Sequence, residues 1–174
     1  MDPLFRVLLL SKYLFELPLP KVQILNFLDT IKYYTMATIQ LKRLDDDYQF
    51  ETVDEAGQVM KMDIPADQGG HGNGVRPMQV LLSALGGCSG VDVVMILKKQ
   101  KETIEQFEMV IQGDRAVGKE PALWETIHVT FKLKGTMTKD KAEKACALSM
   151  DKYCSVAATL RAAGAVITWE VEIG

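Results

Sequence analysis

The stretch that decides the fold is residues 76–99, RPMQVLLSALGGCSGVDVVMILKK. Pro77 suits the first turn of a helix, where its missing N–H would have had no partner. Lys98 and Lys99 close the run, where positive charge suits the negative end of the helix dipole. Apolar residues occupy every face between these ends. The pattern therefore predicts a long helix that is buried on most sides.

The length of this apolar run also raises the question of a membrane-spanning helix. Asp92 and the pair Gly86 and Gly87 argue against one, because a carboxylate at the centre of a bilayer costs about 3 kcal/mol. We therefore expect a core helix and no membrane partner. The glycines beside Cys88 leave two explanations open: room for a substrate or another backbone, or a tight crossing of two buried helices.

The composition of the 174-residue chain is that of an ordinary soluble domain, with 48% hydrophobic and 25% charged residues and a net charge of −3. Basic residues form no stripe, which speaks against a nucleic-acid partner. Three cysteines in a chain of this size do not make the disulfide framework of a small secreted protein. We expect a cytoplasmic protein whose thiols are either buried or reactive.

The first 35 residues differ from the rest of the chain. They are rich in large apolar residues, are divided by Pro18 and Pro20, and lack the basic start and cleavage site of a secretory signal. A regular alternation of apolar and polar residues begins only after Met36. The sequence thus predicts an N-terminal appendage, residues 1–35, followed by one domain, residues 36–174.

Alternating patterns predict the strands of this domain. Three short strands in a meander are expected between residues 38 and 64, and three more at 107–112, 126–134 and 166–173. A capping box from Asp140 to Glu143 begins a helical pattern that continues to Gly164, with a polar break at residues 152–155 where one helix could end and another begin. Strands and helices that do not alternate regularly indicate the α+β class.

Motifs for metal, hydrolytic or phosphate chemistry are missing. His71 and His128 have no Cys or carboxylate at ligand spacing, so we predict no metal site and no cofactor. The three thiols remain as candidates. Cys146 lies among apolar residues and is typical of a small core residue. Cys88 follows two glycines and Cys154 lies in the polar break, where a helix N-terminus lowers the pKa of a thiol. An inert pair and a reactive pair both stay open.

Three segments with two separated cysteine motifs resemble the osmotically inducible protein C and organic hydroperoxide resistance (OsmC/Ohr) family, in particular its OsmC-like branch. They are PMQVLL at 77–82, GGCSGVDVV at 86–94 and LSMDKYCSVA at 148–157. The resemblance covers the chain from about Met36 to its end. It implies an α+β OsmC-like fold in which antiparallel sheets wrap long central helices in an intertwined homodimer.

The same resemblance implies a reactive cysteine pair, Cys88 and Cys154. In peroxidatic members the first thiolate attacks an organic hydroperoxide or hydrogen peroxide and becomes a sulfenic acid. The second cysteine resolves it to a disulfide, which a dithiol reductant reopens. The alternative function is a non-catalytic redox-sensing or small-ligand-binding dimer, and purely structural cysteines are a third possibility.

The sequence departs from the peroxidatic pattern at two supporting positions. Peroxidatic members pair the reactive thiol with an Arg from an N-terminal loop and a Glu at the start of the central helix. Gln79 occupies the Glu position, and no Arg occurs between Arg43 and Arg76. Arg76 and Arg115 are the substitutes that the sequence offers.

Overall fold

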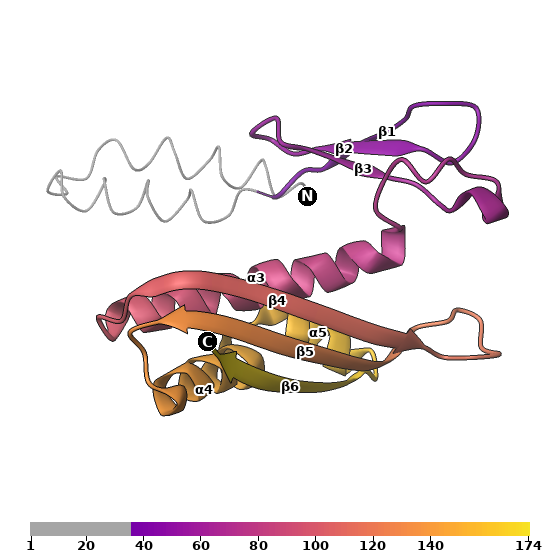
Figure 1. The fold of residues 1–174 in the computed structure, drawn as a ribbon. Coiled ribbons are helices and arrows are strands. Elements are labelled where there is room, and N and C mark those ends of the chain that lie inside the picture. The colour runs from indigo at the N-terminus through magenta and orange to yellow at the C-terminus, as the bar shows by residue number, and fades with distance from the viewer. Residues whose placement is uncertain (1–35) are drawn as a thin grey trace, which may run out of the picture. The chain divides into compact units, whose positions relative to one another are not determined.

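A computed structural model describes residues 36–174 of the chain (Figure 1). The predicted N-terminal appendage, residues 1–35, lies outside the described residues. The elements follow in this order: β1 (Gln40–Arg43), β2 (Phe50–Val53), β3 (Val59–Met62), η2 (Ala66–Gln68), α3 (Pro77–Lys99), β4 (Ile104–Arg115), β5 (Trp124–Gly135), α4 (Lys139–Leu148), η3 (Ser149–Tyr153), α5 (Ser155–Ala162) and β6 (Val166–Ile173).

The three N-terminal strands form a small sheet in the order β1-β2-β3, as expected of a meander. Aspartates build the turns between these strands. The Oδ1 atoms of Asp45 and Asp54 each accept hydrogen bonds from the backbone N–H groups two and four residues further on, at 2.8–3.1 Å. Short polar side chains that bond nearby backbone in this way are the reason why Asp is common in turns.

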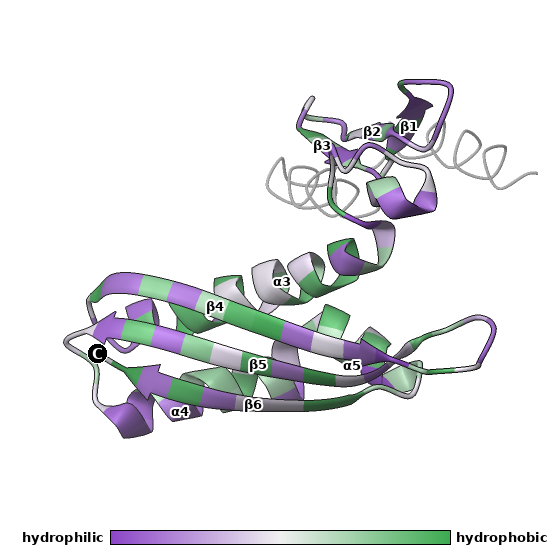
Figure 2. Cartoon of the chain, turned by 45° about the vertical axis from the view of Figure 1, so that its right-hand side comes forward, coloured by the Kyte–Doolittle hydropathy of each residue, from purple (hydrophilic) through white to green (hydrophobic). Residues whose placement is uncertain are grey.

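The second sheet has the order β4-β5-β6, and hydrophilic and hydrophobic residues alternate along its strands (Figure 2). β4 and β5 are antiparallel, with Met109 opposite Phe131. β6 pairs with β5 in parallel, with Trp169 opposite Val129. The expectation of purely antiparallel sheets is therefore wrong for this pair. The helical segment between β5 and β6 carries the chain back along the sheet, so β6 enters in the direction of β5.

The centre of the core is the inner face of β5, as its clear alternation predicts. Its apolar residues are at most 2% exposed: Ile127, Val129, Phe131 and Leu133. The ring of Phe131 lies between Phe107, with a centroid separation of 6.3 Å, and Trp169, at 6.4 Å. Helices α3, α4 and α5 cover this face of the sheet (Figure 1).

Helix α3 begins at Pro77 and ends at Lys99, as predicted. Its fully buried residues recur every four positions: Leu85, Ser89, Val93 and Leu97. The opposite side leaves Val91 and Met95 exposed by 60 and 51%, and Leu81, one turn before Leu85 near the start of the helix, is 40% exposed. Within one chain the helix is therefore buried on one side, and the predicted burial on most sides would need a second copy of the chain. By length and composition α3 could also cross a membrane, a test that core helices of soluble proteins pass as well.

The helical segment after β5 is divided as the polar break predicts. Helix α4 begins one residue before Asp140, because the hydroxyl of Thr138 accepts the N–H of Lys141 and caps it. The N-cap is thus Thr138, which corrects the predicted capping box. A π-helical turn, η3, links α4 to Cys154, and α5 starts at the next residue. Gly164, with φ of +100°, follows the C-cap of α5 and confirms the predicted helix end.

Candidate functional site

Helices α3 and α5 bring Cys88 and Cys154 together. Their sulfur atoms and a carboxylate oxygen of Asp92 all lie within 4.8 Å of one another. Both cysteines are free thiols. Cys88 is half-buried in the middle of α3, whereas Cys154 is buried at the junction of η3 and α5. The closeness of this pair, which the resemblance implied, is confirmed.

The π-helical turn fixes Cys154 at the start of α5. Its backbone N–H bonds the carbonyl of Ser149 at 2.8 Å, and its Sγ accepts the N–H of Ala157 at 3.4 Å as an N-cap. The guanidinium of Arg161 donates to the Met150 carbonyl and so ties α5 to the turn. Burial raises the pKa of Cys154 to about 11 despite the helix N-terminus. The lowered pKa expected for a thiol at this position is therefore not found for Cys154.

The N-terminus of α5 also acts on Cys88, and there its effect is larger than that of burial. The Sγ atom of Cys88 lies 3.8 Å from the hydroxyl oxygen of Ser155. Burial alone would raise the pKa of the Cys88 thiol, but hydrogen bonds from the Val156 and Ser155 N–H groups and from the Cys154 and Ser155 side chains outweigh it. The pKa of Cys88 therefore lies below the ordinary value of a cysteine. Placement against a helix N-terminus is one of the settings that lower the pKa of a thiol and make a cysteine reactive.

Cys146 has the opposite setting. Its side chain is fully buried in α4. Burial, reinforced by the negative charge of Glu143, raises the pKa of this thiol to about 12. The prediction of a core cysteine is confirmed, and Cys146 is a natural control for experiments on the other two thiols.

Asp92 and Ser149 belong to the site although the sequence did not single them out for it. Asp92 lies one turn after Cys88 on α3, and the buried hydroxyl of Ser149 donates to its Oδ2 at 3.0 Å. The spacing of four residues between Cys88 and Asp92 places both on one side of a helix, which is a usable signal. Ser149 gives no such signal, because it lies in another element.

The glycines beside Cys88 differ in role. A Cβ atom on Gly86 would lie 2.7 Å from Cδ1 of Ile111, so Gly86 allows β4 to approach α3 closely. A Cβ atom on Gly87 would meet nothing within 4 Å. Gly86 therefore makes room for a side chain of β4, which is neither another backbone nor a crossing helix, and Gly87 has no such contact.

The three residues considered as supports of the thiol lie elsewhere. Gln79 is exposed in the first turn of α3, roughly 13 Å before Cys88 at 1.5 Å per residue. Arg76 is exposed at the N-cap position of that helix. Arg115 donates through Nε and Nη2 to the Ala122 carbonyl, at 3.0 and 2.7 Å. Within the described part of the chain, none of the three hydrogen-bonds to Cys88.

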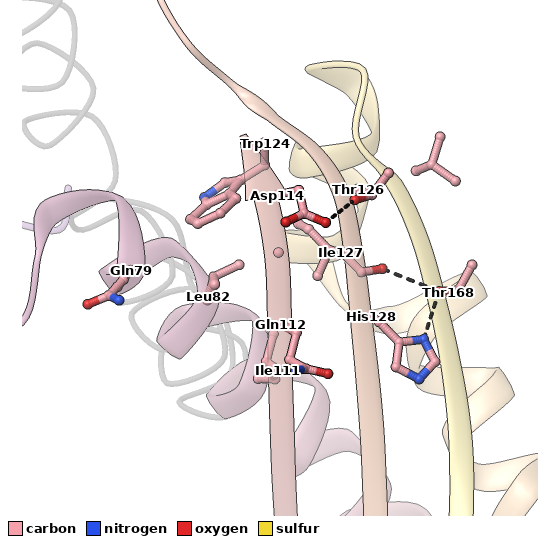
Figure 3. Close-up of a pocket in the computed structure, with 12 residues that line it drawn as sticks. Gln79, Leu82, Ile111, Gln112, Asp114, Trp124, Thr126, Ile127, His128 and Thr168 are labelled. Carbon is pink, nitrogen blue, oxygen red and sulfur yellow. Dashed lines mark hydrogen bonds between the residues drawn. The ribbon is translucent and has the colours of Figure 1, made fainter. Parts of the chain in front are cut away.

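Figure 3 shows the hollow that Gln79 lines, between the start of α3 and the strands β4, β5 and β6. Its volume is about 700 Å³. The strand side chains around it bond one another: Thr126 donates to Asp114 at 3.2 Å, and Nδ1 of His128 lies 2.8 Å from the Thr168 hydroxyl. Neither Cys88 nor Cys154 lines this hollow, so the thiol site is a separate place in the fold.

Comparison with known proteins identifies the family. The family model for OsmC-like proteins matches residues 70–170 of the chain. Protein YhfA of Escherichia coli K12 is 40% identical over 88 residues, a match that covers 50% of this chain and 65% of YhfA. The match thus spans just under two thirds of that relative's length.

Solved structures agree with this assignment. A hypothetical protein from Aquifex aeolicus is 29% identical with a TM-score of 0.66, over 80% of this chain and 98% of that one. The organic hydroperoxide resistance protein OhrB of Bacillus subtilis, only 16% identical, shares the fold with a TM-score of 0.55, over 79% of this chain and 98% of OhrB. The chain has the α+β fold of these proteins, and it belongs to the OsmC-like protein family.

Proposed function

We propose that this protein is a thiol-dependent redox protein that reduces organic hydroperoxides or hydrogen peroxide through Cys88 and Cys154. The observation that carries the proposal is the pair of sulfur atoms within 4.8 Å, with Cys88 against the N-terminus of α5. Membership of a family with organic hydroperoxide resistance proteins supports it. A reducing, cytoplasmic location would supply the dithiol that the cycle needs.

In the first step the Cys88 thiolate attacks the terminal oxygen of the peroxide. The O–O bond breaks, the alkoxide or hydroxide leaves and takes up a proton, and Cys88 becomes a sulfenic acid. The lowered pKa of Cys88 supplies the thiolate. Gly87, the residue before Cys88, adds no side chain there, and a Cβ atom at this position would meet nothing within 4 Å.

In the second step Cys154 attacks the sulfenic sulfur of Cys88. The Cys154 thiol loses its proton, the hydroxyl leaves as water, and a disulfide forms, which an external dithiol then reduces. The two sulfur atoms must close from within 4.8 Å to about 2 Å. The junction between η3 and α5, where the chain leaves helical geometry at Cys154, is the place where this movement is expected.

We also propose that the protein works as a homodimer. The exposed apolar side of α3, with Val91 and Met95, is the surface that a second copy would cover, together with exposed Leu81 near the start of the helix. Large exposed apolar surface on a central helix is costly in water, and most soluble oligomers are symmetric homo-oligomers.

The second candidate function is a redox-sensing dimer without turnover. Gln79 in place of a glutamate favours it, because an uncharged amide cannot orient a supporting arginine as a carboxylate does. In that case Cys88 and Cys154 would oxidise once and signal, rather than cycle.

The test is consumption of tert-butyl hydroperoxide and hydrogen peroxide by the full chain with dithiothreitol in excess and a metal chelator present. We expect multiple turnovers in the wild type and in Cys146→Ser, and none in Cys88→Ser. A wild-type rate no higher than that of Cys88→Ser would reject the peroxidase and leave the sensing dimer.

A further inference from the structure

The reduced site gathers three metal-binding atoms. These are the Sγ atoms of Cys88 and Cys154 and a carboxylate oxygen of Asp92, all within 4.8 Å of one another. When three atoms lie within 4.8 Å of one another, one point between them is at most about 2.8 Å from each of the three. A zinc ion at that point would need ligand distances of about 2.3 Å to sulfur and 2.1 Å to oxygen. Each donor therefore needs to move by only about half an ångström to bind one ion.

The carboxylate of Asp92 has no cation of its own. None of the ion pairs among residues 36–174 involves Asp92, whose polar partner is the Ser149 hydroxyl. Two thiols that become negative on ionisation stand beside it, one buried and one half-buried. Among residues 36–174 no positively charged side chain forms an ion pair with these three groups, so the charge that ionisation of the thiols adds is left for a bound cation to balance.

We propose that the reduced protein binds one thiophilic divalent cation such as Zn²⁺. Its ligands are Cys88, Cys154 and Asp92, with water as the fourth. Thiolates select soft or borderline metals such as zinc over magnesium or calcium. Three protein ligands plus an open position form a common zinc arrangement. The Ser149 hydroxyl, 3.0 Å from Oδ2 of Asp92, orients the carboxylate as outer-shell donors do.

The sequence predicted no metal site because neither histidine has ligands at the usual spacing. The proposed ligands need no histidine. Cys88 and Asp92 share one side of α3, and Cys154 comes from the start of α5. The sequence distance between the two elements hides this combination from any local pattern.

Metal binding and disulfide formation exclude each other, because both use the same two sulfur atoms. Binding releases the two thiol protons and changes no oxidation state. If the proposed peroxidase activity holds, the metal-bound dithiolate reacts with one hydroperoxide molecule, ROOH, and two protons. The products are the disulfide, the alcohol ROH, water and the released cation. Metal binding itself does not depend on that activity.

The experiment is a titration of the reduced full chain with Co²⁺ in oxygen-free buffer without added thiols. We expect a thiolate-to-cobalt absorption band that saturates at one equivalent and is abolished by Zn²⁺. Cys88→Ser and Cys154→Ser should remove the band. Asp92→Asn, and Ser149→Ala to a smaller extent, should weaken binding by about tenfold or more. Cys146→Ser is the matched control and should bind as the wild type does.

Two measurements on the unmodified sequence guard against variants that fail to fold. Zn²⁺ should protect Cys88 from alkylation, and oxidation to the disulfide should abolish the cobalt band. Absence of a band at equimolar Co²⁺, or an unchanged band in Cys88→Ser or Asp92→Asn, would overturn the site. No peroxide enters the titration, so a failed titration and a failed peroxidase assay are separate results.

Discussion

The Sγ of Cys88 lies 3.8 Å from the Oγ of Ser155, and this contact sets a thiol from the middle of α3 against the first turn of α5. Hydrogen bonds from that turn oppose the effect of burial and lower the pKa of Cys88, while burial raises the pKa of Cys154 to about 11. Two sulfur atoms within 4.8 Å thus differ in acidity, because the donors of α5 outweigh burial at Cys88, whereas burial outweighs the N–H of Ala157 at Cys154.

Removing the Ser155 hydroxyl should weaken this activation. A hydrogen bond to a charged group is worth about 1.5 kcal/mol, so Ser155→Ala should slow alkylation of Cys88 at neutral pH by up to about tenfold. Because the pKa of Cys88 is lowered in the wild type, its alkylation rate should rise with pH and reach its plateau at a lower pH than the rate of a free cysteine does. The profile of Ser155→Ala should move to higher pH.

The profile is measured with iodoacetamide, with a chelator present, on proteins that carry Cys146→Ser and Cys154→Ser so that only Cys88 reacts. A Ser155→Ala profile that coincides with its parent would show that the hydroxyl does not stabilise the thiolate.

Phe131→Ala should strongly destabilise the fold. The ring is fully buried at the centre of the core between Phe107 and Trp169, and deleting it leaves a cavity. The expected loss in the free energy of unfolding is about 3–5 kcal/mol by urea denaturation. Val110→Ala, on the outer face of β4, is the control and should cost less than about 1 kcal/mol. Equal losses would contradict the assignment of the core.

Much of the fold follows from periodicity, but the direction of β6 does not. The alternation along β4, β5 and β6 predicts which residues face the core, and Val129 and Trp169 obey it. A period of two is the same in parallel and antiparallel strands, so the parallel pairing comes only from the crossover through α4 and α5. Likewise, a helix that is apolar all round does not reveal that Leu85 faces its own sheet and Val91 does not.

The cysteine pair could be predicted only through the family motifs, and the groups around it could not. The hydrogen bond between Ser149 and Asp92 joins η3 to α3, two elements that lie far apart in sequence. No local pattern signals such a contact. Asp92 and Ser155 lie inside the family motifs at 86–94 and 148–157, but those motifs gave neither residue a role at the thiols.

Val91→Asp should disrupt the proposed homodimer. Val91 is 60% exposed within one chain, at the centre of the apolar side of α3. A carboxylate buried without a partner costs several kcal/mol, so dimer dissociation should increase by more than about tenfold. Sedimentation at micromolar concentration measures the change, and Val117→Asp, in the exposed loop between β4 and β5, is the control. A folded wild-type monomer at that concentration would reject the dimer.

A protein that begins at Met36 should fold as the full chain does. The strand pattern starts only after this residue, and β1 begins at Gln40. We expect a cooperative thermal transition and a far-ultraviolet circular dichroism spectrum of the α+β type. Loss of the cooperative transition would mean that residues 1–35 are part of the domain.

The roles of the two thiols predict an asymmetric trapping experiment. Cys88 is the more readily ionised and the more exposed, so it should attack the peroxide, and buried Cys154 should resolve the product. After one equivalent of peroxide, Cys154→Ser should accumulate a sulfenic acid at Cys88 that dimedone labels, whereas Cys88→Ser should leave Cys154 largely unlabelled. Cys146→Ser should form the disulfide as the wild type does. Strong labelling of Cys154 in Cys88→Ser would exchange the two roles, and labelling of neither variant would favour the sensing or structural alternatives.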